Sequence, residues 1–270
     1  MRSVNFNTHA FAFLKMCVSS SMKDMPTPTR DETLRIFEAS PLLETLPKRE
    51  IAELVPHARH RDLAPGEAVF LADSSDRDFY WVSRGRLRLT TNNRNGGELL
   101  HAMAEVGNQF GEVTPIDGGM RGVNAIADQS SSVITLDREV LLPVVLQYPE
   151  SALRLAQLLC RQIRLAGETL HNLALNNAEA RIWTRLIQMS KTYGTIDPAS
   201  GALHVAHGLS QQDLASTVGL TRVKVNRQLT LWREHGLVDY GRGYVAIRDP
   251  ESFEAYVWEK IEAPGAPDGG

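Results

Sequence analysis

Cysteine is scarce in this chain, which contains only Cys17 and Cys160 among its 270 residues. Two thiols are too few for a disulfide framework, an all-cysteine zinc site or a four-thiolate iron–sulfur cluster. Both are therefore expected to be free, as is usual in a reducing cytoplasm. The most apolar N-terminal stretch, residues 9–18, is interrupted by Lys15 and makes a poor signal peptide.

Long hydrophobic runs and excess charge of either sign are also missing. No segment approaches the roughly 18 to 20 consecutive apolar residues of a membrane-spanning helix, so we expect a cytoplasmic protein with no membrane partner. The chain has 29 Lys and Arg against 32 Asp and Glu. This balance excludes a protein that coats nucleic acid with its whole surface, but it allows one locally basic face.

Short strand-like segments fill the first half of the chain. Residues 61–136 contain apolar or alternating runs separated by turn sequences such as APGE, DSSD and NNRNGG, which is typical of a small antiparallel sandwich or barrel. Gly66, Gly85 and Gly107 stand in such turns and are expected to supply conformations that other residues resist. Before the barrel, residues 33–58 have helical spacing with proline breaks, which predicts two or three short helices.

A long uninterrupted helical pattern begins at Pro149 and runs to about Ala174. Asp137 is expected to cap the shorter helix before it. Leucines on one side, Leu153, Leu158 and Leu165, can dock on the barrel. The other side carries an apolar stripe that we expect to meet a second copy of the chain: Leu155, Leu159, Ile163, Ala166, Leu170 and Leu173. A helix that packs only on its own domain is the alternative.

The C-terminal part predicts two helices joined by a tight turn. Ser210 is followed three residues later by Asp213 and can cap the first helix, Gly219 ends it, and Thr221 can cap the second. This arrangement indicates a helix-turn-helix. On the second helix one face is apolar and can be buried, while polar residues occupy the first two turns: Arg222, Lys224, Asn226 and Arg227.

Positive charge is concentrated in this C-terminal part. The sequence LVDY, the turn GRG and the sequence YVAI predict a hairpin, or wing, with Arg242 at its tip. Residues 210–248 contain six Lys or Arg and three Asp or Glu, a net charge of +3 in a chain whose total is −3. A groove-reading helix presents cations in this way. A solvated basic helix face remains the simpler alternative.

These elements, in this order, resemble the CRP/FNR superfamily of bacterial transcription regulators over about residues 40–248. The most specific stretches are LSQQDLASTVGLTRVKVNRQLTLWREHGLV and NQFGEVTPIDGGMRGVNAIA. The resemblance implies an α+β fold in which an antiparallel β-roll, a jelly-roll-like double-stranded β-helix, is joined by a long dimerisation helix to a winged helix-turn-helix domain.

The same resemblance gives expected boundaries for each part. They are the cyclic-nucleotide-binding-like β-roll (31–148), the dimerisation helix (149–177) and the winged helix-turn-helix (178–250). Composition adds a flexible extension (residues 1–30) before them and a short helix with a disordered tail (251–270) after them. On that short helix, Trp258 is expected to pack inward.

The resemblance also implies which residues bind DNA. Thr221 would contact phosphate, and Arg222 and Arg227 would read guanine edges. Val223 replaces the acid that is usual in the family, so a cytosine contact is lost and the operator differs. The expected DNA-binding residues are Ser210, Gln211, Thr221, Arg222, Val223, Lys224, Asn226, Arg227 and Arg242. The implied partners are double-stranded DNA, a second copy of the chain and RNA polymerase.

An effector pocket is implied by the residues Phe110, Gly111, Glu112, Arg121 and Gly122. In cyclic-nucleotide-binding relatives such a glutamate accepts from the ribose and such an arginine holds the phosphate, which suits their chemistry. Gly122 stands where a small side chain is expected, and Ala166-Gly167 stands where a Thr-Ser pair is common, which argues against cAMP. A salt bridge between Glu112 and Arg121 that binds no ligand is left open.

Two other function classes compete with a DNA-binding regulator. A cyclic-nucleotide-binding module that acts on a protein partner would keep the barrel but leave the basic helix without a role. A cupin-type metalloenzyme would use His57, His60 and Glu67, but those residues lie at a helix end and a strand entry, with no third imidazole. We expect no enzyme activity, no catalytic residues and no metal site.

Overall fold

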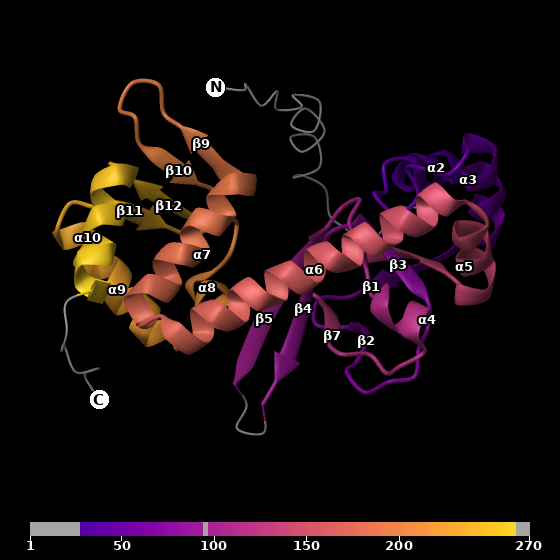
Figure 1. Ribbon diagram of the computed structural model, residues 1–270, viewed down its shortest axis with the longest axis horizontal. Coiled ribbons are helices and arrows are strands. Elements are labelled where there is room, and N and C mark those ends of the chain that lie inside the picture. Colours follow the sequence, from indigo (N-terminus) through magenta and orange to yellow (C-terminus); the bar gives the residue numbers. More distant parts are fainter. Residues whose placement is uncertain (1–27, 94–96, 263–270) are drawn as a thin grey trace.

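The computed structural model describes residues 28–93 and 97–262, which form two lobes joined by one long helix (Figure 1). The expected extension over residues 1–30 lies almost entirely outside the described residues. So does the C-terminal tail from residue 263. No helix within the described ranges is both long enough and apolar enough to cross a lipid bilayer.

The N-terminal lobe is a β-roll of two four-stranded antiparallel sheets. One sheet has the order β1-β8-β3-β6 and the other β2-β7-β4-β5. The strands are β1 (Arg59–Leu63), β2 (Ala68–Phe70), β3 (Phe79–Arg84), β4 (Arg86–Asn92), β5 (Glu98–Glu105), β6 (Gln109–Phe110), β7 (Asn124–Ala127) and β8 (Ser131–Leu136). A core drawn from both sheets lies between them and includes Leu63, Phe70, Tyr80, Val82, Leu87, Phe110 and Val133.

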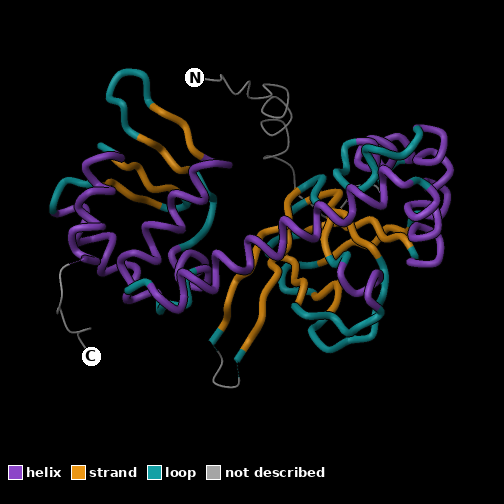
Figure 2. Tube along the Cα trace, in the orientation of Figure 1, coloured by secondary structure: helices purple, strands orange, loops and turns teal. Residues whose placement is uncertain are grey.

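Helices cover the outer face of the first sheet (Figure 2). They are α2 (Arg30–Glu38), α3 (Lys48–Leu54), the 3₁₀ turn η1 (Val55–His57) and α5 (Arg138–Gln147), while α4 (Val113–Asp117) follows β6. Every residue of β8 is buried because one of its faces meets the inner core and the other meets these helices. Asp137 precedes α5 without capping it, since its carboxylate pairs with Arg59 instead.

The helix α6 (Pro149–Leu175) connects the two lobes and is 27 residues long. Its first turns pack on the β-roll, where Leu155 is buried in the core beneath the helices. From Cys160 onward most of its side chains are exposed. The helix therefore has a docked beginning and a second half that protrudes from its own lobe.

The C-terminal lobe combines a third antiparallel sheet, β11-β12-β10-β9, with four helices. Its elements are α7 (Ala178–Tyr193), β9 (Gly194–Ile196), β10 (Leu203–Val205), α8 (Gln211–Thr217), α9 (Arg222–Glu234), β11 (Val238–Gly241), β12 (Tyr244–Ile247) and α10 (Pro250–Glu262). Phe253 of α10 lies edge-on against Trp183 and Trp232, so α10 completes this core. The side chain of Trp258, which we expected to pack inward, lies outside the described residues.

Candidate nucleic-acid interface and effector pocket

The helices α8 and α9 begin at caps that the sequence predicts. The Ser210 hydroxyl accepts from the Asp213 amide at 3.1 Å, and the Asp213 carboxylate accepts from the Ser210 amide at 3.1 Å, which forms a capping box. The Thr221 hydroxyl accepts from the Lys224 amide at 3.3 Å. Gly219 has φ +63° in the turn between them. Caps and turn together fix the angle at which α9 leaves α8.

One face of α9 is buried and holds the helix on its lobe. Val225, Leu229 and Trp232 recur at intervals of four and three residues and are almost inaccessible. The Trp232 indole N–H also donates to the Glu179 carboxylate at 2.7 Å. Because this side of α9 is buried, the side chains on its opposite side point to solvent.

The residues expected to read DNA lie on that exposed face. Arg222, Val223, Lys224, Asn226 and Arg227 are all exposed, and 77% of the Val223 side chain is accessible. Within the described part of the chain, no carboxylate forms an ion pair with the three cations of this group. A cluster of exposed, unpaired cations at a helix N-terminus is suited to meet an external polyanion.

The wing shares an open hollow with the starts of both helices. This hollow is lined by Ser210, Gln211, Gln212, Arg222, Tyr240, Gly241 and Arg242. Four of these residues are in the expected DNA-binding set. Gln212, Tyr240 and Gly241 were not predicted, because their proximity depends on how β11 folds back along α9.

Tyr240 attaches the wing to the reading helix. Its hydroxyl lies 2.9 Å from the Thr230 hydroxyl and donates to the Asn226 side-chain oxygen at 3.5 Å, while the Arg233 guanidinium lies 4.8 Å from its ring centre. These contacts hold the wing, which carries Arg242 at its tip, beside α9. Asn226 therefore helps to position the wing, although it remains exposed on α9.

The residues of the expected effector pocket gather inside the β-roll. Phe110 is buried in an aromatic cluster, with its ring centre 5.4 Å from Tyr80 and 6.0 Å from Phe70. Gly111 has φ +76°, and a Cβ there would lie 2.7 Å from Arg121 Nη1. Only glycine therefore fits so close to that guanidinium.

Arg121 is buried, and neighbours within its own lobe accept four hydrogen bonds from its guanidinium. Its Nε and Nη2 donate to Asp76 Oδ2 at 3.1 and 2.7 Å, Nη2 also donates to the Asp78 carbonyl at 2.6 Å, and Nη1 donates to the Gly111 carbonyl. Asp76 was not predicted, because nothing local in the DSSD turn indicates a partner 45 positions away. As these residues stand, they do not fit a cyclic phosphate.

The salt bridge between Glu112 and Arg121 that we left open is not formed. Glu112 is buried and accepts instead from the Gln162 amide of α6. Burial raises the pKa of the Glu112 carboxyl, and the bond from Gln162 and the charge of Arg121 only partly offset that effect. Gly122 is exposed and has no neighbour near its Cβ position. The contact between Glu112 and Gln162 links the pocket to the long helix.

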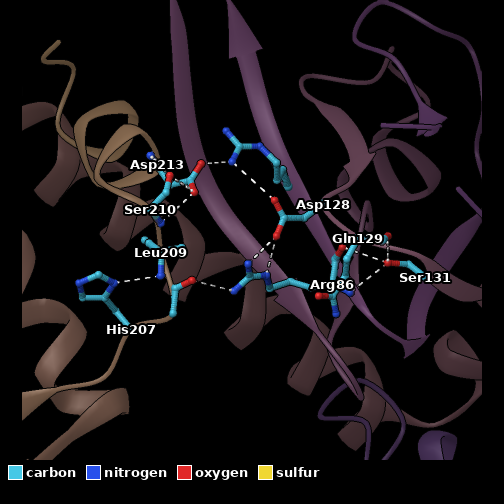
Figure 3. Close-up of polar contacts among 10 residues, drawn as sticks. Arg86, Asp128, Gln129, Ser131, His207, Leu209, Ser210 and Asp213 are labelled. Carbon is cyan, nitrogen blue, oxygen red and sulfur yellow. Dashed lines mark hydrogen bonds and ion pairs between the residues drawn. The ribbon is translucent and has the colours of Figure 1, made fainter. Parts of the chain in front are cut away.

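A network of charged groups joins the two lobes directly (Figure 3). Arg88 of β4 forms ion pairs with Asp213 of α8 and with Glu98, and Arg86 forms one with Asp128. Arg86 Nη1 also donates to the Gly208 carbonyl at 3.4 Å, just before the α8 cap. We call these residues the interlobe network. They fix the first helix of the helix-turn-helix against the β4–β5 hairpin.

The expected dimer stripe divides into two parts. Ile163 and Leu170 are 72% and 68% exposed, and Ala166 between them is exposed too. Leu155 is only 5% exposed because it lies in the core of its own lobe, so its assignment to the dimer interface is wrong. Leu159 and Leu173 are half-buried, and Leu173 approaches the Gly219 turn. Of the opposite leucines, Leu158 packs on the roll, whereas Leu153 and Leu165 are exposed.

The residues of the cupin alternative are not brought together. The His60 Nε2 lies 3.3 Å from the Thr33 hydroxyl, and Glu67 pairs with Arg61 at 2.7 Å. Over residues 28–93 and 97–262, no cluster of three His, Cys, Asp or Glu side chains is arranged to hold a metal ion. His60 and Glu67 thus each contact a side chain that is no metal ligand in this set.

Comparison with protein families finds a match in each lobe. The Crp-like helix-turn-helix domain matches residues 180–256. The cyclic nucleotide-binding domain matches residues 60–148. The first range contains the capped helices and the wing, and the second contains the β-roll.

Relatives match both lobes together. The CRP-like cAMP-activated global transcriptional regulator of Mycobacterium tuberculosis is 27% identical over 201 residues, which cover 74% of this chain and 89% of that protein. The Cyclic AMP receptor protein of Thermus thermophilus is 27% identical over 218 residues, covering 81% and 97%. FixK2 from Bradyrhizobium japonicum has the same fold, with a TM-score of 0.62 at 21% identity over 77% of this chain and 99% of that one.

Both lobes thus match in the order in which they occur here, and the relatives that span them are regulators of transcription rather than enzymes. The chain belongs to the CRP/FNR superfamily of transcription regulators, with a cyclic nucleotide-binding domain followed by a Crp-like helix-turn-helix.

Proposed function

We propose that the chain binds a palindromic operator as a homodimer in the cytoplasm, with α9 in the major groove and the wing along the adjacent phosphates. The observation that carries this proposal is the set of exposed, unpaired cations at the start of α9: Arg222, Lys224 and Arg227. Arg222 also lines one hollow with the wing cation Arg242. The rival module that acts on a protein partner leaves these cations without a role.

The second half of α6 supports the dimer. Ile163, Ala166 and Leu170 recur along one exposed line, and isolated soluble proteins seldom leave such a line uncovered. Two copies paired through α6 would place two helix-turn-helix units, which we call the reading heads, on half-sites about one helical turn of DNA apart. RNA polymerase is proposed as a further partner on the resemblance to the family alone.

We assign regulation to the β-roll through its contact with α6. The bond from Gln162 to Glu112 joins the pocket to the long helix, and the interlobe network joins β4 to α8. A change in the β-roll would therefore alter both the pairing of the two α6 helices and the position of α8 against the roll. Such a coupling requires that the two states of the roll differ in these contacts.

The test is fluorescence anisotropy on a duplex selected from a random library. Arg222→Ala and Arg227→Ala should each weaken specific binding by about 1 to 3 kcal/mol and relax the preference at one base pair. Lys224→Ala should weaken all duplexes alike and reduce the salt slope by about one. Arg35→Ala removes an exposed arginine of the other lobe and should change nothing. Equal affinity for random duplex, or unchanged binding by both arginine variants, refutes the assignment.

A further inference from the structure

The carboxylate of Asp76 lies between a buried cation and solvent. The Arg121 side chain is 1% exposed, whereas that of Asp76 is 28% exposed. Asp76 Oδ2 accepts from Arg121 Nε and Nη2 and from the Tyr80 hydroxyl at 2.8 Å, and Asp76 Oδ1 accepts from the Asp78 amide at 3.2 Å. An anion that enters from solvent would meet this carboxylate before it met the guanidinium.

The guanidinium has almost no hydrogen-bonding capacity left. A guanidinium carries five N–H donors, and the contacts to Asp76, to the Asp78 carbonyl and to the Gly111 carbonyl use four of them. The ring of Phe70 covers its flat face, with the ring centre 4.2 Å from the guanidinium carbon. Two of the four bonds go to a single carboxylate, as they would to a bound phosphate.

Further negative charge surrounds this position. The Asp78 carboxylate lies close by and pairs with Arg59 at 2.6 Å. Burial raises the pKa of Asp78 to about 6, and the charges of Asp76 and Asp137 add to that effect although Arg59 opposes it. A phosphate that displaced Asp76 would leave its carboxylate unpaired beside a like charge, which is unfavourable.

We propose that Asp76 is a built-in counter-ion that occupies the anion position beside Arg121, so that the β-roll adopts its anion-bound arrangement without a cyclic nucleotide. This inference rests on the proposed function, in which the roll controls the reading heads. It assigns the chain to regulators that bind DNA without a nucleotide. Asp76 is then the residue that excludes nucleotide phosphates from the pocket.

The test compares the full-length protein with Asp76→Asn and Asp76→Ala in calorimetric titration and thermal unfolding, with cAMP, cGMP and inorganic phosphate as probes. Asp73→Asn is the matched control, because it makes the same change on an exposed residue of the same turn whose positive φ asparagine tolerates. The wild type and the control should show no titration at millimolar anion. The Asp76 variants should unfold at lower temperature, and anion should restore about 5 °C or more.

Titration of the wild type by a cyclic nucleotide that Arg121→Gln abolishes would overturn the inference. Lack of an anion response in both Asp76 variants would also overturn it, because another group would then fill the position. If Asp76→Ala does not fold in plain buffer, refolding in phosphate would support the inference. Failure to refold in phosphate would count against the inference. These readouts involve no DNA, so a protein that binds no duplex would refute the proposed function and leave this result intact.

Discussion

Arg88 in the β-roll forms an ion pair with Asp213, the residue whose carboxylate also completes the cap of α8. One carboxylate therefore caps a helix locally and also joins the two lobes, through a residue 125 positions away in the chain. Burial alone would raise the pKa of Asp213, but the bonds from Ser210 and Arg88 outweigh it and lower that pKa. The folded state thus keeps this group ionised between two donors.

The first prediction concerns this pair. Both side chains are largely buried, at 17% and 11% exposure, so the pair is little screened by solvent. A double-mutant cycle of Arg88→Ala and Asp213→Asn should give a coupling free energy of about 0.5 to 3 kcal/mol. Denaturant unfolding of the four proteins measures it. The exposed pair of Arg49 and Glu53 is the control and should show a clearly weaker coupling, because solvent screens both charges. Equal coupling in both pairs would contradict this account.

A second prediction concerns base preference. Val223 is exposed in the first turn of α9, where its side chain can contact a thymine methyl group but accepts no hydrogen bond. Val223→Glu should favour cytosine at one operator position by about 1 to 3 kcal/mol. Sequencing of duplexes selected by each protein measures the change. Val106→Glu, an exposed valine in the other lobe, should select the same motif as the wild type. An identical motif from Val223→Glu would remove Val223 from the reading set.

A third prediction concerns assembly. Ile163→Asp places a charge in the middle of the exposed stripe of α6 and should convert the proposed dimer into a monomer. Light scattering coupled to size exclusion measures the mass. Leu165→Asp makes the same change on the other side of the helix, where 50% of the side chain is exposed, and should leave the dimer intact. A wild-type protein that is monomeric at micromolar concentration would refute the proposed seam.

A fourth prediction concerns pH. Burial, with a smaller contribution from Arg185, lowers the pKa of His207 to about 4. Its Nδ1 accepts from the Leu209 amide at 3.0 Å, which requires the neutral ring. The His207 ring of the unfolded chain binds a proton near pH 6.5, whereas that of the folded chain binds it only near pH 4. The contribution of His207 to stability should therefore fall as pH drops from about 6.5 to 4 and stay constant below that. The loss should be about 3 kcal/mol or less.

Urea unfolding at several pH values checks this dependence. His207→Gln should flatten the pH profile over that interval, whatever its effect on stability at pH 7. His204→Gln removes an exposed histidine of the same lobe and should leave the wild-type slope. A slope that persists in His207→Gln would assign the titration to another group.

Local backbone chemistry was the part of the fold that could be predicted. Ser210 and Thr221 cap their helices and Gly219 adopts positive φ, because caps and turns depend on residues within a single turn. The first strand was expected to begin near His60, but the bounds of β1 were not predicted, since RHRDL is a polar edge strand with little apolar alternation. Asp137 shows a limit of local reasoning. Its carboxylate, expected to cap α5, instead accepts a hydrogen bond from Arg59, which is distant in the sequence.

The candidate pocket was predictable only in part for the same reason. Phe110, Glu112 and Arg121 do lie within one lobe, but their partners Asp76 and Gln162 come from segments with no motif of their own. The apolar stripe of α6 could be predicted because apolar residues recur every three or four positions in its sequence. Its period could not show that Leu155 is covered by the same chain, because coverage depends on tertiary packing.

The approach of Leu173 to the Gly219 turn has a mechanical consequence. The far end of the connecting helix abuts the joint between the two helices of the reading head, where a Cβ on the glycine would lie 3.2 Å from the leucine. A small rotation of α6 about its long axis would therefore displace the turn between α8 and α9. A bulkier residue at position 219 would restrict that rotation.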